Sequence, residues 1–303
     1  MACFGVGTDS GFIHSFQTSS VYCETTNNQY FEITSFVFNP YHTGTIKCLA
    51  VCRRYIASSC SDGVIEIYDN VLKRDIGCVS LIGRPNELNF YRSQLLVATC
   101  ADGYIRVWST SCWFLVYEIK AHIPGHSSIT FLKNSYCFQT VGADKYIKVW
   151  HLKRRRFKAK AKLESKPFKI CSSNDTDRYA IIFEDYFRVY NYSIYSTKTI
   201  EQTEVLAVCF LGEYIVYGGE FNHISIYSID KNRHIVQWDT QYTKTIDLKV
   251  LRIPSFGPVI LATHFEGEVV VYDARNICEN ENSPIFCRLP LHSRPTCFAV
   301  ENN

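Results

Sequence analysis

The feature that most restricts the fold of this 303-residue chain is a short apolar motif that recurs about every forty residues. In each copy an aromatic residue ends a run in which apolar residues stand one and three places earlier. The six aromatic residues, at successive spacings of 40, 42, 40, 37 and 45 residues, are Tyr68, Trp108, Trp150, Tyr190, Tyr227 and Tyr272. Such period-two alternation predicts a β-strand. The chain is therefore expected to repeat one β-rich unit.

Two more apolar runs precede each motif, as residues 46–51 and 55–58 do in the first copy. Short strands at this spacing are typical of the four-stranded blades of WD40 β-propellers. An acidic residue also recurs six places before the aromatic residue, namely Asp62, Asp102, Asp144 and Glu266. Separate blades cannot bring these carboxylates to one substrate, so we expect a structural role, with each accepting backbone N–H groups in its own turn.

The two ends of the chain together supply a seventh unit. Residues 4–16 resemble the second and third strands of a blade, and residues 31–38 resemble an outer strand. The missing first strand is supplied by residues 295–300. We therefore expect an all-β fold, a single domain over residues 1–303 that forms a seven-bladed WD40 β-propeller. Blade seven would be closed by N- and C-terminal strands, which removes the exposed sheet edges that an arc of six blades would leave.

Composition and motifs exclude several classes of function. Hydrophobic residues make up 47% and charged residues 20% of the chain, as in globular proteins, and no apolar run is long enough to span a membrane. The 14 cysteines include no Cys-x-x-Cys pair, so we expect buried free thiols and no metal site. Phosphate-loop, zinc-protease and hydrolase motifs are absent. We expect no enzymatic activity, no cofactor and no small-molecule substrate.

Many WD40 blades contain a buried hydrogen-bonded set of a histidine, a hydroxyl residue, the turn aspartate and the tryptophan. His42, Asp62 and Tyr68 occupy three of these places in the first full blade, and Cys60 stands where we expect the hydroxyl. Cys100 and Gly142 stand at the same place in the next two blades. We therefore expect the network to be incomplete and these blades to depend mainly on packing.

Positive charge is concentrated in residues 153–169, after the third full repeat. This segment has a net charge of +8, and subtracting it from the +3 of the whole chain leaves −5 for the remainder. Its nine basic residues are Lys153, Arg154, Arg155, Arg156, Lys158, Lys160, Lys162, Lys166 and Lys169. Alternation over residues 157–163 predicts an outer strand with a row of lysines. The lysines could protect a sheet edge from aggregation, or the segment could bind RNA phosphates or direct nuclear import.

Propellers generally bind partners through the loops that enter the first strand and those between the second and third strands, because the rigid ring positions these loops. Seven polar residues are expected to be exposed there and to form an interaction face. They are Arg53, Arg54, Arg84, His122, Lys145, His264 and Arg294.

Several stretches carry a family resemblance. The most distinctive stretch is residues 141–152, Val-Gly-Ala-Asp-Lys-Tyr-Ile-Lys-Val-Trp-His-Leu. Further matching stretches, which occur in the same order along the chain as in the family, are residues 42–51 with 61–69, residues 114–122 and residues 287–298. Together they resemble the WD40 family of PAK-interacting proteins, whose fungal relatives include MAK-type nucleolar factors of large-ribosomal-subunit assembly.

This resemblance implies a non-enzymatic scaffold of ribosome biogenesis, located in the nucleolus or nucleus. Its partners would be the pre-60S ribosomal particle, with pre-rRNA, assembly proteins and a placeholder ribosomal-like protein. The alternative is a cytoplasmic signalling adaptor that binds and regulates a PAK-type protein kinase or a ubiquitin ligase component.

Overall fold

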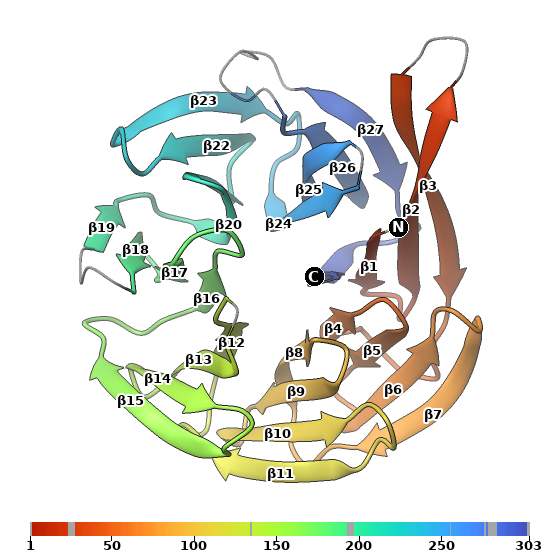
Figure 1. The fold of residues 1–303 in the computed structure, drawn as a ribbon, viewed down its shortest axis with the longest axis vertical. Coiled ribbons are helices and arrows are strands. Elements are labelled where there is room, and N and C mark those ends of the chain that lie inside the picture. The colour runs from red at the N-terminus through yellow and green to blue at the C-terminus, as the bar shows by residue number, and fades with distance from the viewer. Residues whose placement is uncertain are drawn as a thin grey trace.

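The computed structural model describes residues 2–23, 28–133, 135–192, 197–254, 256–275, 277 and 284–301. Within these ranges 28 β-strands form seven four-stranded antiparallel sheets. The sheets stand as blades around a common centre (Figure 1). The predicted all-β fold, a seven-bladed β-propeller, is confirmed. No helix in the described part of the chain is long and apolar enough to cross a lipid bilayer.

Blades one to six follow the chain, and each runs from the centre of the ring outwards. Blade one contains β4 (Cys48–Val51), β5 (Tyr55–Ser59), β6 (Val64–Asp69) and β7 (Arg74–Ser80). Blade two contains β8 (Pro85–Tyr91), β9 (Leu95–Cys100), β10 (Tyr104–Ser109) and β11 (Leu115–Lys120). Blade three contains β12 (Ser127–Phe131), β13 (Cys137–Gly142), β14 (Tyr146–His151) and β15 (Arg156–Lys162). Blade four contains β16 (Lys169–Ser172), β17 (Arg178–Ile182), β18 (Phe187–Asn191) and β19 (Thr197–Ile200). Blade five contains β20 (Val205–Leu211), β21 (Tyr214–Gly219), β22 (His223–Ser228) and β23 (Arg233–Asp239). Blade six contains β24 (Thr245–Ile253), β25 (Gly257–His264), β26 (Glu268–Asp273) and β27 (Ile285–Pro290).

Blade seven joins the two ends of the chain. Its strand order is β28 (Pro295–Val300), β1 (Ala2–Thr8), β2 (Ile13–Cys23) and β3 (Asn28–Phe38). β28 pairs antiparallel with β1, with Phe4 opposite Val300 and Val6 opposite Phe298. The predicted closure by both termini is thus confirmed, and Figure 1 shows β28 beside β1 on the inner side of blade seven.

The core is divided among the contacts between neighbouring blades. Because side chains alternate along a strand, each blade presents one apolar face to each neighbour. The buried apolar residues accordingly form seven clusters, one between each adjacent pair of blades. Between blades two and three, for example, Val97 and Ile105 pack with Phe138 and Trp150. Side-chain packing therefore holds each blade in a fixed position relative to the next.

The antiparallel meander gives the ring two distinct faces. The turns between the second and third strands and the links between blades lie on one face, which we call the top face. The turns between the first and second strands and between the third and fourth strands lie on the other, the bottom face. Loops of opposite faces are therefore separated by the ring, except where an outer strand connects them along the rim.

Candidate interaction surfaces

Most of the basic segment 153–169 follows the outside of blade three, where β15 is the outermost strand (Figure 1), and its last residue, Lys169, begins β16 of blade four. Lys153, Arg154 and Arg155 form the bottom-face turn between β14 and β15, and Lys166 lies in the top-face link that follows β15. Every residue of β15 is exposed, and this outer strand carries Arg156, Lys158, Lys160 and Lys162. The structure thus places eight of the nine predicted basic residues on the molecular surface.

Among the described residues, no carboxylate neutralises the charges of these eight residues. Within the described ranges none of them forms a salt bridge, and the neighbouring Glu164 pairs instead with Arg188 of blade four. Several cations lie over aromatic rings, with Lys153 Nζ 5.3 Å from the ring centre of Tyr136 and Arg155 Cζ 5.3 Å from that of Tyr117. Such contacts orient a cation without cancelling its charge. The segment is therefore a surface of uncompensated positive charge.

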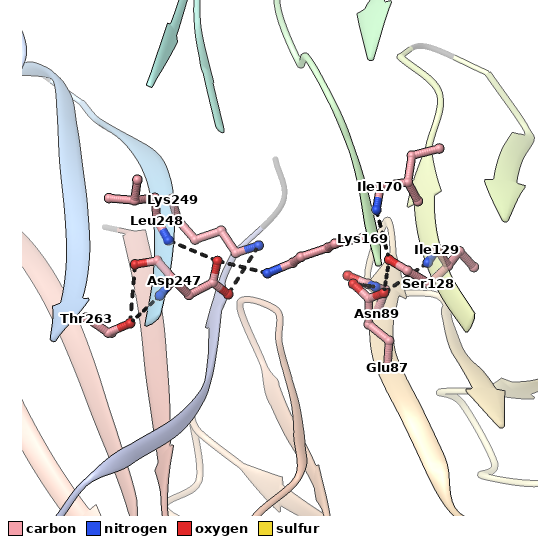
Figure 2. Close-up of polar contacts among 10 residues, drawn as sticks. All are labelled: Glu87, Asn89, Ser128, Ile129, Lys169, Ile170, Asp247, Leu248, Lys249 and Thr263. Carbon is pink, nitrogen blue, oxygen red and sulfur yellow. Dashed lines mark hydrogen bonds and ion pairs between the residues drawn. The ribbon is translucent and has the colours of Figure 1, made fainter. Parts of the chain in front are cut away.

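Lys169, the ninth basic residue, departs from the expectation because it points to the centre of the ring (Figure 2). Its Nζ lies 2.9 Å from Oδ1 of Asp247 on β24, and Lys249 Nζ lies 3.8 Å from Oδ2 of the same carboxylate. Burial alone would raise the pKa of Asp247, but the charges of Lys169 and Lys249 outweigh it and lower the pKa. Lys169 therefore joins blades four and six and is not part of the exposed basic surface.

A second polar group lies beside this ion pair (Figure 2). Glu87 of β8 accepts hydrogen bonds from Ser128 Oγ at 2.7 Å and from the backbone N–H of Ile129 at 2.9 Å. Ser128 Oγ in turn accepts from the backbone N–H of Ile170 at 3.2 Å. These contacts link blades two, three and four, so the first strands are connected by polar groups as well as by packing.

The seven residues expected on one interaction face are distributed differently. Arg84, Lys145 and Arg294 are exposed in top-face loops, as expected. Arg53 and Arg54 are exposed too, but they lie in the turn between β4 and β5 and thus on the bottom face. The interaction face therefore separates into two groups that cannot contact the same site on a partner.

His122 and His264 correct the expectation of exposure, since both are buried, at 4% and 0% exposed. His122 Nδ1 lies 2.7 Å from Asp144, and its Nε2 lies 2.9 Å from the Thr140 hydroxyl. Trp150 Nε1 donates to the same hydroxyl at 2.9 Å. Burial lowers the pKa of His122, so a neutral ring can donate to Asp144 and accept from Thr140. The expectation of an incomplete network is wrong for blade three.

Blade one contains a partial version of this network. His42 Nδ1 lies 2.8 Å from Asp62, and its Nε2 lies 3.1 Å from Ser58 Oγ, but the buried hydroxyl of Tyr68 has no partner. In both blades the hydroxyl stands four residues before the aspartate and not two, which is why Cys60 misled the sequence interpretation. The donor atoms of His42, Cys60 and Asp62 lie within 4.8 Å of one another. Both ring nitrogens of His42 already have hydrogen-bond partners, so we assign these three side chains to stabilisation of the turn.

The other two recurring acidic residues also have local partners. Asp102 accepts from Arg106 at 2.7 Å and from the backbone N–H of Tyr104 at 3.0 Å. Glu266 accepts from the backbone N–H of Thr243 at 2.8 Å. Gly103, which follows Asp102, has φ +86, and an added Cβ would lie 2.2 Å from the carbonyl oxygen of His122. The contacts of Asp102 are those expected of a structural turn residue, whereas Glu266 departs from the expectation because its partner lies in the link between blades five and six.

The burial of His264 predicts a pH-dependent stability. Its ring stacks on Tyr242 at 4.1 Å, its Nε2 has no partner, and burial lowers its pKa to about 4. Unfolded chains bind this proton near pH 6.5, so the stabilisation is complete above pH 6.5 and is lost as the pH falls towards 4. Between pH 6.5 and 5.5 the protein should lose about 1 kcal/mol more unfolding free energy than a His264→Phe variant. Urea unfolding at the two pH values measures this, and equal losses would contradict it.

The bottom face also contains a pocket of about 400 Å³ between blades two and three. Its walls include Tyr91, Ser109, Ser111, Tyr136 and Lys153, and no carboxylate residue lines it. Arg92 Cζ lies 5.3 Å from the ring centres of both Tyr91 and Tyr136. Of these residues the sequence interpretation singled out only Lys153, because no motif connects the turn at residue 92 with the turn at residue 136. A second pocket of about 410 Å³ lies on the top face beside the predicted residue Arg84.

Comparison with known proteins agrees with this architecture. No protein-family model matches the chain. The p21-activated protein kinase-interacting protein 1-like of Gallus gallus is 24% identical over 264 residues, which cover 86% of this chain and 71% of that protein. Shk1 kinase-binding protein 15 of Schizosaccharomyces pombe is 25% identical, with 86% and 74% covered. Protein MAK11 of Saccharomyces cerevisiae is 32% identical over 98 residues, 27% of this chain and 24% of that protein. The resemblance to PAK-interacting proteins is thereby confirmed.

Solved structures support the fold. The structure of U3-55K superposes with a TM-score of 0.70 over 82% of this chain and 83% of that one. The WD40 repeats of RRP9 superpose with a TM-score of 0.72 over 82% of both chains. Sequence identity is 12% in each case, so the likeness concerns the WD40 propeller fold alone.

Proposed function

We propose that this propeller is a non-enzymatic scaffold for assembly of the pre-60S ribosomal particle. It would act in the nucleolus or nucleus and contact pre-rRNA, a placeholder ribosomal-like protein and other assembly proteins. The observation that carries the proposal is the exposed turn Lys153–Arg154–Arg155, whose cations have no carboxylate partner among the described residues. Edge protection accounts for lysines along β15, but a turn has no strand edge to protect. The family resemblance, with its MAK-type relatives, supplies the ribosomal context.

The proposed binding to RNA is electrostatic and independent of base sequence. Each phosphate that a lysine or arginine contacts releases a counterion, so affinity depends steeply on salt. Apart from Lys166, the exposed basic residues lie on the bottom face and outer rim, whereas Arg84, Lys145 and Arg294 lie on the top face. The scaffold can therefore hold RNA at the bottom and rim and a protein at the top. This arrangement suits a factor that joins components of a particle.

Charge reversal of the turn tests this function. The variant Arg154→Glu, Arg155→Glu, Arg156→Glu should lower recovery of large-subunit precursor rRNA with the tagged protein by at least about tenfold, because three phosphate contacts are lost. Sequencing of the co-purified RNA measures it. The control reverses two other exposed residues, Lys231→Glu and Arg233→Glu in blade five, and should retain the RNA. Absence of precursor rRNA from the wild-type purification would refute the function.

A second candidate is favoured by the names of the relatives, which describe kinase-interacting and kinase-binding proteins. The chain would then be a cytoplasmic adaptor that binds and regulates a PAK-type kinase. Binding would use the propeller faces and not the basic turn. Kinase capture that survives the triple charge reversal, together with no recovery of precursor rRNA by the wild type, would support the adaptor over the ribosomal scaffold.

A further inference from the structure

The pocket between blades two and three lies where aromatic side chains and cations meet. Tyr91 and Tyr136 supply aromatic surface, with ring centres 5.9 Å apart. Arg92 and Lys153 each place a cation 5.3 Å from the ring centre of Tyr136. Lys153 lines the pocket, whereas Arg92 lies beside it, over the rings of Tyr91 and Tyr136. Neither cation has a salt bridge among the described residues, so neither charge is paired with a carboxylate there. A ligand that presents a flat ring and a negative charge together would match these groups.

The position of each group explains how it could contribute. Tyr91 is buried, and its hydroxyl donates to the carbonyl of Ser135 at 3.0 Å, so its ring is a fixed part of the wall. Tyr136 is 40% exposed and stacks on His151 at 6.2 Å, so it borders the opening. The hydroxyls of Ser109 and Ser111 lie 2.8 Å apart in the same pocket and can bond polar ring atoms. The volume of about 400 Å³ suits a ligand of nucleotide size.

We propose that this pocket binds a single unpaired nucleotide of an RNA strand, with the base against Tyr136 and its phosphates at Arg92 and Lys153. The inference rests on the proposed function, since it assigns a site for the RNA. A base in the pocket must leave its stack, which favours single strands over duplexes. The neighbouring Arg154 and Arg155 continue the positive surface and can follow the next phosphates. The pocket thus distinguishes single-stranded from duplex RNA, while the basic segment attracts RNA phosphates independently of base sequence.

Variants of Tyr136 test the pocket with a single-stranded oligouridylate and a duplex of equal length, followed by fluorescence anisotropy. Tyr136→Ala should weaken single-strand binding about tenfold, because the base loses its stacking partner. The slope of affinity against salt should stay unchanged, because no phosphate contact is lost. Tyr136→Phe should retain affinity. Arg92→Ala should weaken binding and reduce the salt slope by about 0.7. Tyr41→Ala, a change to a 79% exposed tyrosine on the top face, is the matched control and should have no effect.

A measurement on the unmodified protein guards against a misfolded variant. Single-stranded RNA that contains 4-thiouridine should photocrosslink to the peptides that carry Tyr91 or Tyr136. Crosslinks confined to the top face would overturn the proposal, as would equal binding by wild type and Tyr136→Ala. A phosphoserine peptide that binds the pocket while RNA does not would assign it to a phosphoprotein instead. If the triple arginine variant loses RNA but Tyr136→Ala does not, the pocket is refuted and the scaffold function stands.

Discussion

Replacement of Asp247 by alanine is expected to lower the free energy of unfolding by about 3 kcal/mol, because it leaves two partly buried cations without their partner. Asp247 is 7% exposed, and its carboxylate accepts from Lys169 Nζ and from the backbone N–H of Leu248, both at 2.9 Å. Its removal would leave the charges of Lys169 and Lys249 together at the centre of the ring. Urea unfolding followed by tryptophan fluorescence measures the loss.

An exposed ion pair provides the matched control. Asp175 pairs with Arg252, but the two side chains are 32% and 55% exposed, and solvent screens such a pair. Asp175→Ala should therefore cost less than about 1 kcal/mol. Asp247→Asn, which keeps an acceptor for Leu248 and removes the charge, should fall between the two. Equal losses in Asp247→Ala and Asp175→Ala would show that the central ion pair does not stabilise the ring.

Thr140→Val is the second change with a large expected effect, about 3 kcal/mol of unfolding free energy. Valine has the shape of threonine but lacks the hydroxyl that joins His122 Nε2 and Trp150 Nε1. Both nitrogens belong to buried residues, and each buried polar group without a partner costs about 1 to 3 kcal/mol. Thr140→Ser, which restores the hydroxyl, should recover most of the stability. The same unfolding experiment measures all variants.

Blade one offers the comparison for this network. Ser58 occupies the place of Thr140, but it serves only His42, because the Tyr68 hydroxyl has no partner there. Ser58→Ala leaves a single group unsatisfied and should cost about 1 kcal/mol. A loss as large as that of Thr140→Val would mean that the aromatic donor contributes nothing to the network.

The fold could be predicted from the sequence because its information is local and repeated. Each blade ends in an alternating run with an aromatic residue, and the spacing of these runs limits the unit to four short strands. The closure of blade seven could also be predicted, because the N-terminal unit lacks a first strand and the C-terminal residues 295–300 form one strand that belongs to no other unit. Both predictions depend on strand periodicity, which a propeller preserves in every blade.

The contacts of individual site residues could not be predicted, because strand periodicity does not show which side chains lie close together in space. Residues 140 and 142 lie on the same side of β13, so alternation cannot tell which of them meets His122. The structure shows that both do so in different ways, because His122 Nε2 bonds the Thr140 hydroxyl while its ring lies where a side chain at Gly142 would stand. Lys169 was counted with the basic segment because it is near in sequence, yet the chain turns inward before β16. Arg92 and Tyr136 meet only because blades two and three pack together, and no spacing in the sequence indicates that contact.

The closure of blade seven also determines the order in which the molecule can form. The backbone N–H of Cys3 donates to Glu301, 298 positions along the chain, and β1 has no inner neighbour until β28 arrives. During synthesis β1 emerges first and β28 last, so the hydrogen-bonding edge of β1 stays unpaired while six blades assemble. Contacts between such distant segments form slowly, and an open strand edge invites pairing with another chain. The nascent protein is thus most exposed to misassembly just before its ring shuts, when a chaperone would have the greatest effect.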